Sequence, residues 1–145
     1  MAKFKYKFET IKKIKETMEK KTQKELSLIE LEITKTNEAI KNLLVSIKLH
    51  KAKLTTNGTV KVNMLHYLQN YELLIDKKIE TLQKHITELN KSKEKKIAEL
   101  AQRTKEAKMF EKLKEKHYLD FLNEQKKIEQ IEIDEIAAKK FVRES

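Results

Sequence analysis

Four histidines are the residues of this chain best suited to acid–base or metal chemistry: His50, His66, His85 and His117. His85 and Glu88 are three residues apart, which places them on one face of a helix, and His50 could approach His66 if the chain folded back between them. Structural zinc takes four strong ligands. The chain has no cysteine, and no histidine is followed by another three or four residues later. We therefore expect no metal or cofactor.

The other groups that commonly catalyse reactions lack a suitable setting. The carboxylates alternate with lysines, a pattern typical of solvated helix faces, where such pairs give only modest support to the helix. A chain with one glycine cannot build a glycine-rich phosphate loop, and no serine stands in a nucleophile elbow. We predict that the protein is not an enzyme.

The composition indicates long helices rather than a thick globular core. Of 145 residues, 39% are charged and 39% hydrophobic, one is glycine and none is proline. Since glycine and proline are the main breakers of regular structure, we expect few turns. No apolar run approaches the roughly 18 to 20 residues that cross a bilayer, and the lack of cysteine favours a reducing cytoplasm. The net charge of +10 permits nucleic acid, acidic lipid or an acidic protein as partner.

One turn stands out, at residues 55–59 around Asn57-Gly58, because this dipeptide tolerates positive φ. Apolar residues recur at alternating spacings of three and four on both sides of it, which is the heptad pattern of a coiled coil. The sequence predicts an all-α fold, a single domain over residues 1–145. Two long helices form an antiparallel coiled-coil hairpin: helix one over about 4–53, a turn over about 54–61, and a longer helix two over about 62–141.

The two heptad series also predict a register. If the chain folds back at Asn57-Gly58, facing residues have numbers that sum to 115, as for Ile33 with Leu82 and Ile40 with Ile75. Both series skip eight residues at mirrored places, 18 to 26 and 89 to 97, which an insertion at one level would explain. The alternative, a parallel dimeric coiled coil with a flexible middle, gives no reason for the matching registers.

Apolar residues exceed what this seam needs in two regions. At about 1.5 Å per residue helix two is longer than helix one by roughly 45 Å, so its last thirty or so residues have no partner within the chain. An apolar overhang of this kind would be disordered, self-associated or buried in a partner. Near the turn, outward positions hold Val45, Leu49, Tyr67, Leu73 and Leu74, which form either a protein-binding patch or the padding of a wider local core.

Three segments resemble the signature of the flagellar type III export protein FliJ family: residues 110–118 (FEKLKEKHY), 123–128 (NEQKKI) and 134–137 (DEIA). The opening residues 4–8 (FKYKF) and the hairpin in mid-chain are also similar to that family. The resemblance implies a non-enzymatic adaptor of flagellar protein export. Such an adaptor is cytoplasmic, is recruited to the membrane at the flagellar base through partners only, and is monomeric alone.

The resemblance also implies three partners: the export ATPase FliI, the export-gate protein FlhA and the export chaperones. It assigns ATPase binding to residues near the C-terminus: Phe110, Leu113, Tyr118, Phe121, Gln125, Asp134 and Glu135. It assigns export-gate binding to residues near the turn: Val45, Leu49, Tyr71, Leu74, Lys78 and His85.

Two other functions remain open from the residues themselves. A generic cytoplasmic scaffold would oligomerise through the overhang. A basic coiled coil that binds nucleic acid would use the lysine-rich first turns, although arginine is restricted to Arg103 and Arg143 and no groove-reading module is recognisable. We therefore expect no nucleic-acid partner.

Overall fold

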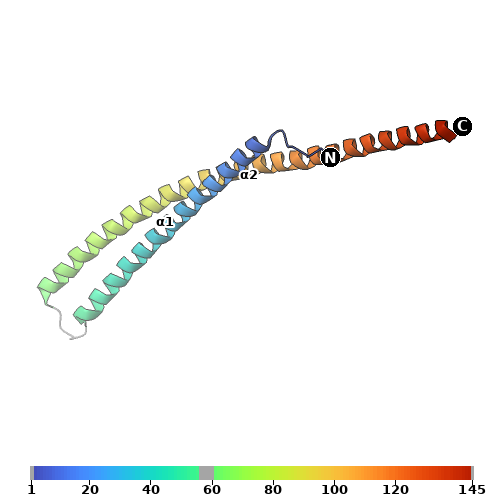
Figure 1. Ribbon diagram of the computed structural model, residues 1–145. Helices are drawn as coiled ribbons and strands as arrows, with labels where there is room; N and C mark the ends of the chain where they lie inside the picture. The colour runs from blue at the N-terminus through green and yellow to red at the C-terminus, as the bar shows by residue number, and fades with distance from the viewer. Residues whose placement is uncertain (1, 56–60, 145) are drawn as a thin grey trace. The chain divides into compact units, whose positions relative to one another are not determined.

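The computed structural model describes residues 2–55 and 61–144, which form two helices, α1 (Glu9–Thr55) and α2 (Val62–Glu144). They pack against each other in antiparallel directions (Figure 1), which confirms the predicted all-α hairpin with a longer C-terminal helix. The predicted Asn57-Gly58 turn lies outside the described residues. Contacts divide the chain into a loop-side unit, Lys21–Leu100, and a terminal unit, Met1–Lys20 with Ala101–Ser145. Each unit is described by itself.

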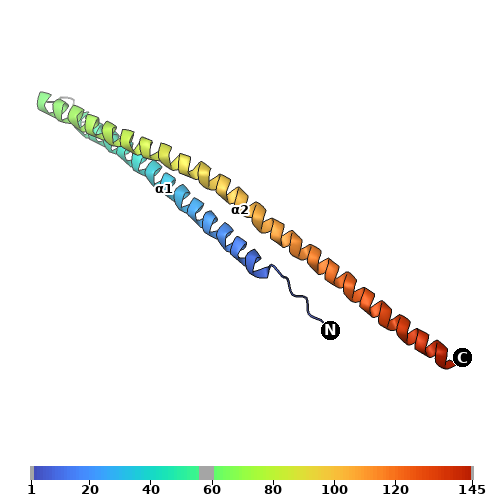
Figure 2. The ribbon, with the colours of Figure 1, turned by 90° about the horizontal axis from the view of Figure 1, so that it is seen from above.

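The loop-side unit is held by a narrow apolar seam between α1 and α2, which lie side by side in Figures 1 and 2. The predicted series are on the inner faces of both helices, and the most deeply buried members are Thr36 and Ile75, with 5% and 3% of their surface exposed. Leu65 is an exception, because 45% of its surface is exposed, so the seam of α2 begins at Leu68 instead.

Contacts across the loop-side unit agree with the direction of the predicted register. The numbers of contacting residues sum to between 117, for Ser46 with Tyr71, and 123, for Lys51 with Glu72. Side chains of an α-helix point toward the N-terminus of that helix. Two side chains in contact between antiparallel helices therefore belong to residues whose numbers have a larger sum than the numbers of two residues at the same height along the hairpin. The sum of 115 for facing seam residues stays a prediction.

The predicted interruption of the heptads is wrong. Met18 and Ile97, which were expected to continue the seam, are 38% and 47% exposed, whereas Thr22 between the two α1 series is only 3% exposed. The buried positions of α1 run through Thr22 at unbroken spacings of three and four, because a two-stranded coil keeps one face toward its partner. Polar residues therefore occupy the inner face where the sequence placed isoleucine and methionine.

The bounds of the helices differ from the prediction at both ends. α1 begins at Glu9, not near Phe4, and α2 ends at Glu144, not near Phe141. Residues 2–8 are not helical; we call them the N-terminal arm. Their exposure alternates from one residue to the next, which is the period of an extended chain. Neither described helix contains a stretch apolar enough to span a membrane.

Candidate docking surfaces

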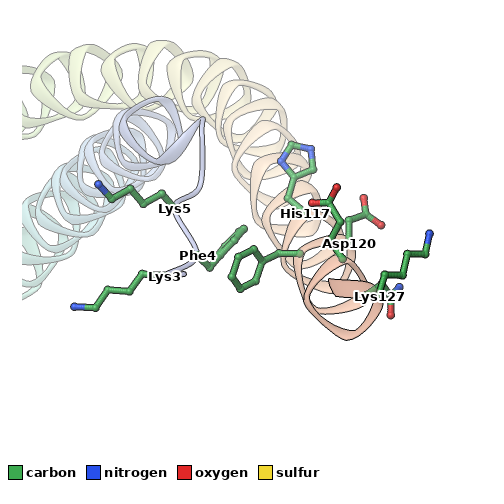
Figure 3. Close-up of a pocket in the computed structure, with 9 residues that line it drawn as sticks. Lys3, Phe4, Lys5, His117, Asp120 and Lys127 are labelled. Atoms are coloured by element: carbon green, nitrogen blue, oxygen red, sulfur yellow. The ribbon is translucent and has the colours of Figure 1, made fainter. Parts of the chain in front are cut away.

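The N-terminal arm packs an aromatic edge onto α2 within the terminal unit. Phe4 and Phe8 are half-buried and Tyr6 is 8% exposed, whereas the lysines between them are exposed. Figure 3 shows the Phe4 side chain directed to α2, with Lys3 and Lys5 extending away from it. The strict alternation of lysine and aromatic residues over 3–8 is the sequence signal that indicates this extended segment.

Ring contacts and one long-range hydrogen bond attach the arm. The Phe4 ring lies 5.3 Å from that of Tyr118 and 5.5 Å from that of Phe121, centroid to centroid. The Tyr6 ring lies 5.6 Å from the His117 imidazole, and its hydroxyl donates a hydrogen bond of 3.0 Å to the carbonyl oxygen of Phe110. These distances are typical of edge-to-face aromatic pairs. The arm thus takes the place of α1 on this part of α2.

The resemblance assigned ATPase binding to seven residues, and the structure divides them into three groups. Phe110, Tyr118 and Phe121 contact the arm, so this chain already covers part of their surface. Leu113 and Gln125 are half-buried. Asp134 and Glu135 are exposed, and the Gln130 side-chain amide donates a hydrogen bond of 3.0 Å to Asp134 Oδ1.

The overhang of α2 is shorter than predicted, because the arm covers residues that were expected to have no partner. From Lys126 to Glu144 every residue is exposed; we call this segment the overhang, and α2 extends past the arm there in both views (Figures 1 and 2). Its large apolar side chains are 48% to 76% exposed. They are Ile128, Ile131, Ile133, Ile136, Phe141 and Val142. Water therefore contacts an apolar surface along the overhang.

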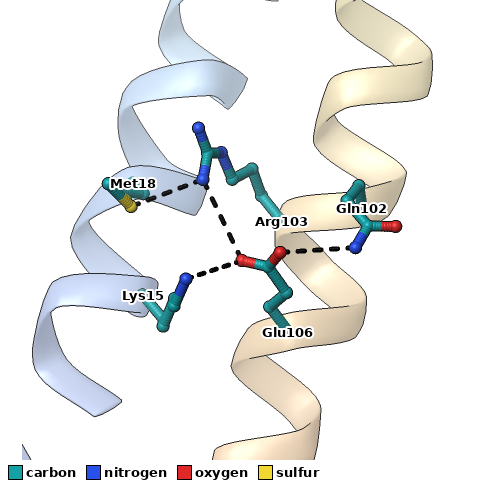
Figure 4. Close-up of polar contacts among 5 residues, drawn as sticks. All are labelled: Lys15, Met18, Gln102, Arg103 and Glu106. Atoms are coloured by element: carbon teal, nitrogen blue, oxygen red, sulfur yellow. Dashed lines mark hydrogen bonds and ion pairs between the residues drawn. The ribbon is translucent and has the colours of Figure 1, made fainter. Parts of the chain in front are cut away.

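On its α1 side, the inner face of the terminal unit is ionic rather than apolar. Glu106 receives the Lys15 ammonium at 3.0 Å and the Arg103 guanidinium at 3.9 Å, and the Gln102 amide donates to its other oxygen (Figure 4). The hydrogen bond from Lys15 is the main cause that lowers the pKa of the Glu106 carboxyl below its ordinary value, followed by that from Gln102. An equivalent pair joins Glu9 Oε2 to Lys114 Nζ at 3.0 Å.

Charges are sorted between the two faces of α1 in this unit. Over residues 9–20 all three glutamates are half-buried on the side that faces α2, and the exposed charged residues are Lys13 and Lys20. Ile11, Ile14 and Met18 are 38% to 50% exposed beside them. The outward face of this α1 segment is therefore basic and apolar. The sequence pattern missed this for Met18, which it placed in the seam.

The residues assigned to gate binding lie in the loop-side unit and differ in accessibility. Val45, Leu49 and Leu74 are 47% to 58% exposed, and their neighbours Tyr67 and Leu73 are 60% exposed or more. All five are therefore exposed at outward positions of the two helices rather than packed as the padding of a wider core. We call these five residues the loop-side patch.

Of the other three assigned residues, Tyr71 and His85 contact side chains of α1, and Lys78 is exposed. Tyr71 stacks on His50 with 4.6 Å between ring centroids, and its hydroxyl shares a hydrogen bond of 2.7 Å with the Ser46 hydroxyl. His85 Nε2 lies 3.8 Å from Glu32 Oε1. Lys78 and Leu74 line a shallow, mostly apolar groove of about 370 Å³, together with Leu43, Lys77, Thr81 and Leu82.

The histidines are distributed over separate environments. His50 stacks on Tyr71, His85 faces Glu32, His117 packs between Tyr6 and Phe8, and His66 is exposed. Over residues 2–55 and 61–144, no three histidine, aspartate or glutamate side chains are grouped to hold a metal ion.

A comparison with protein families decides which class of coiled coil this is. The model of the FliJ family, described as flagellar FliJ protein, matches residues 4–145, nearly the whole chain. The chain belongs to the FliJ family. Membership implies a non-catalytic coiled-coil component of the flagellar export apparatus. No curated protein and no solved structure matches the chain.

Proposed function

We propose that this FliJ-family protein binds the flagellar export ATPase through its terminal unit and the export gate FlhA through its loop-side unit. By holding several ATPase subunits it promotes assembly of the ATPase ring, and by contacting the gate it couples the ring to export and to the export chaperones. The protein is cytoplasmic and reaches the membrane at the flagellar base through these partners.

The single observation that carries the ATPase role is the uncovered overhang. Residues 126–144 are helical and exposed throughout, and six of them carry large apolar side chains that are 48% to 76% exposed. Exposed apolar area of this kind marks a binding surface, and an amphipathic helix is a common element for docking into a groove. The resemblance to the FliJ family implies an export ATPase as a partner, and this supports assigning the ATPase to the overhang.

The gate role rests on the loop-side patch. Its apolar side chains are exposed beside a seam that is already complete, so packing of the hairpin does not require them. Aromatic and apolar residues are enriched at the centres of protein interfaces. Leu74 also lines the groove with Lys77 and Lys78, which suits an apolar side chain flanked by acidic residues.

The experiment mixes the purified protein with the export ATPase and measures hexamer formation and ATP hydrolysis. Removal of residues 126–145 is the informative deletion, because a deletion from Phe110 would also remove the surface on which the arm packs. We expect the intact chain to stimulate hydrolysis and the truncated chain not to do so. A matched pair keeps the helix intact: Ile128→Ala with Ile131→Ala should weaken stimulation, and Glu129→Ala with Glu132→Ala should not.

The result that would contradict the ATPase role is stimulation that does not change when residues 126–145 are removed, with circular dichroism showing both proteins folded. For the gate role the corresponding variant is Leu74→Ala, which should lower affinity for the cytoplasmic domain of FlhA.

The exposed overhang also supports a second function, a cytoplasmic scaffold that oligomerises through this segment. Light scattering over a range of protein concentrations separates the two functions. A mass that rises with concentration and falls on truncation at Lys126 favours the scaffold, whereas a monomer at all concentrations favours the adaptor.

A further inference from the structure

The N-terminal arm is attached to α2 by side chains alone. In the described part of the chain, its only backbone hydrogen bonds are local ones to α1, from Glu9 N–H to Tyr6 O and from Lys12 N–H to Phe8 O. Neither bond reaches α2. The arm can therefore leave α2 without breaking any backbone hydrogen bond between the two, at the cost of its ring contacts and the Tyr6 hydroxyl bond.

The surface under the arm is continuous with the uncovered surface of the overhang. The inner positions of α2 beneath the arm, Phe110, Lys114, His117 and Phe121, follow heptad spacing. The same spacing continues through Glu124, Ile128, Ile131, Glu135, Ala138 and Val142, all exposed. We call the whole series the α2 stripe. A partner that packs along it from the overhang meets the arm between Lys127 and His117, where the arm and α2 line an open cavity of about 690 Å³.

We propose that the N-terminal arm is an autoinhibitory strap, which occupies part of the α2 stripe and must be displaced when the ATPase packs along that stripe. This inference rests on the proposed function, since it specifies how the ATPase reaches its site. The arm supplies three aromatic side chains to the stripe, so the segment that replaces it presents apolar or aromatic side chains to Phe110 and Phe121.

Displacement has a measurable consequence for affinity. When only a fraction of a protein is competent to bind, the apparent dissociation constant equals the intrinsic one divided by that fraction. If the arm is docked for about nine-tenths of the time, releasing it tightens binding about tenfold. If the arm had only a structural role, releasing it would leave the affinity for the ATPase unchanged. If the arm itself contacted the ATPase, releasing it would weaken binding.

The first test loosens the arm in the full-length chain. Tyr6→Ala removes the buried ring and the hydrogen bond to Phe110, and Lys5→Ala is the matched control, because Lys5 is exposed on the opposite edge. We expect Tyr6→Ala to tighten binding of the ATPase about tenfold and Lys5→Ala to leave it unchanged. Unchanged or weaker binding of Tyr6→Ala would overturn the strap.

The second test fastens the arm. The chain has no cysteine, so Lys3→Cys with Asp120→Cys introduces the only two thiols, both at the rim of the cavity. A reducible bis-maleimide linker should join them, lower affinity for the ATPase and release it again on reduction. Equal affinity of the linked and reduced forms would contradict the proposal.

Failure of the proposed function is distinguishable, because exposure of the stripe is measured without the partner. A single Phe121→Cys should react slowly with a maleimide and faster when Tyr6→Ala is added. If neither form binds the ATPase, the proposed function is wrong. The labelling rates then decide whether the arm covers the stripe, and equal rates would overturn the strap as well.

Discussion

The loop-side unit and the terminal unit place different types of residue at the same inner heptad positions. In the loop-side unit the inner positions hold isoleucine and leucine, with Ile75 the least exposed of them at 3%. In the terminal unit the inner positions of α1 hold lysine and glutamate, and its isoleucines lie outside. The two helices therefore pack side by side in both units, but α1 contributes an apolar seam in the loop-side unit and a charged one in the terminal unit, where Tyr6 of the arm and Ala107 of α2 are buried.

The two units therefore differ in the contacts that stabilise them and in the surfaces that they leave exposed for partners. An apolar seam drives packing of the loop-side unit, so its exposed patch is additional to the fold. In the terminal unit ion pairs and an aromatic arm hold the helices, and partly exposed ion pairs contribute little. The apolar residues that the seam does not use remain available to a partner.

The largest expected effect is loss of the loop-side seam. Ile75→Ala should lower the free energy of unfolding by about 2–4 kcal/mol, because it removes a nearly fully buried side chain. Leu74→Ala, next to it but 56% exposed, should change it by less than about 0.5 kcal/mol. Urea unfolding followed by circular dichroism at 222 nm measures both. Equal losses of unfolding free energy in the two variants would show that the inner and outer faces of α2 do not differ in their contribution to stability.

Replacing the ionic centre of the terminal unit should stabilise the protein. Lys15→Leu combined with Glu106→Leu removes both members of the pair and offers an apolar contact between α1 and α2, as in a conventional seam. We expect the midpoint of thermal unfolding to rise by a few degrees, and Glu106→Leu alone to lower it, because Lys15 is then left without its carboxylate. A fall in the double variant would show that the ionic face is needed for packing.

The carboxylates of both units predict a stability that falls at acid pH. Hydrogen bonds from lysine lower the pKa values of Glu9, Glu25 and Glu106, with Lys114, Lys96 and Lys15 as the respective donors. A carboxyl with a lowered pKa in the folded state stabilises the fold above its unfolded pKa, and loses that contribution as the pH falls through the folded value. The thermal midpoint should therefore fall as the pH drops below about 4.5, the ordinary value.

Substituting Glu106→Gln tests that linkage. It should flatten part of this acid dependence, and an unchanged profile would show that the pair does not contribute. At the alkaline end, the pKa of Lys96 is raised by its hydrogen bonds to Glu25 and then Glu99. Its stabilising contribution is complete below 10.5 and is lost only as the pH rises further.

The smallest effect is expected on the outer face of α1. Ile14→Gln, at a residue 50% exposed, should change the free energy of unfolding by less than about 0.5 kcal/mol. A large loss in urea unfolding would place Ile14 in a seam after all.

The sequence predicted the fold well wherever apolar periodicity was unambiguous. Leu26, Ile33, Ile40 and Leu82 lie on the inner faces as expected. It failed at the predicted interruption, where the apolar residues Met18 and Ile97 were expected in the seam but are exposed. The periodicity of one helix alone does not show which of two neighbouring stripes will face the partner helix. In the structure, the stripe that faces α2 is the polar one, which continues the seam of α1 without a break.

The sites divide in a similar way. Exposure of Leu74 and Leu49 follows from their outward heptad positions, which the sequence shows. The contact of Phe121 with Phe4 depends on a segment folding back over residues more than a hundred positions away, which local pattern does not encode. The alternation of lysine and aromatic residues over 3–8 would have indicated an extended arm, but not its docking place.

The measurement that tests the separation of the two docking surfaces most directly is a crossover of two variants against two partners. Affinities of the export ATPase and of the cytoplasmic domain of FlhA are measured for Ile128→Ala with Ile131→Ala, and for Leu49→Ala with Leu74→Ala. We predict that the first variant loses affinity only for the ATPase and the second only for FlhA, each about tenfold, as for interface residues that cost more than about 1 kcal/mol. The prediction is contradicted if either variant loses affinity for both partners, or if both variants keep their full affinity for both partners.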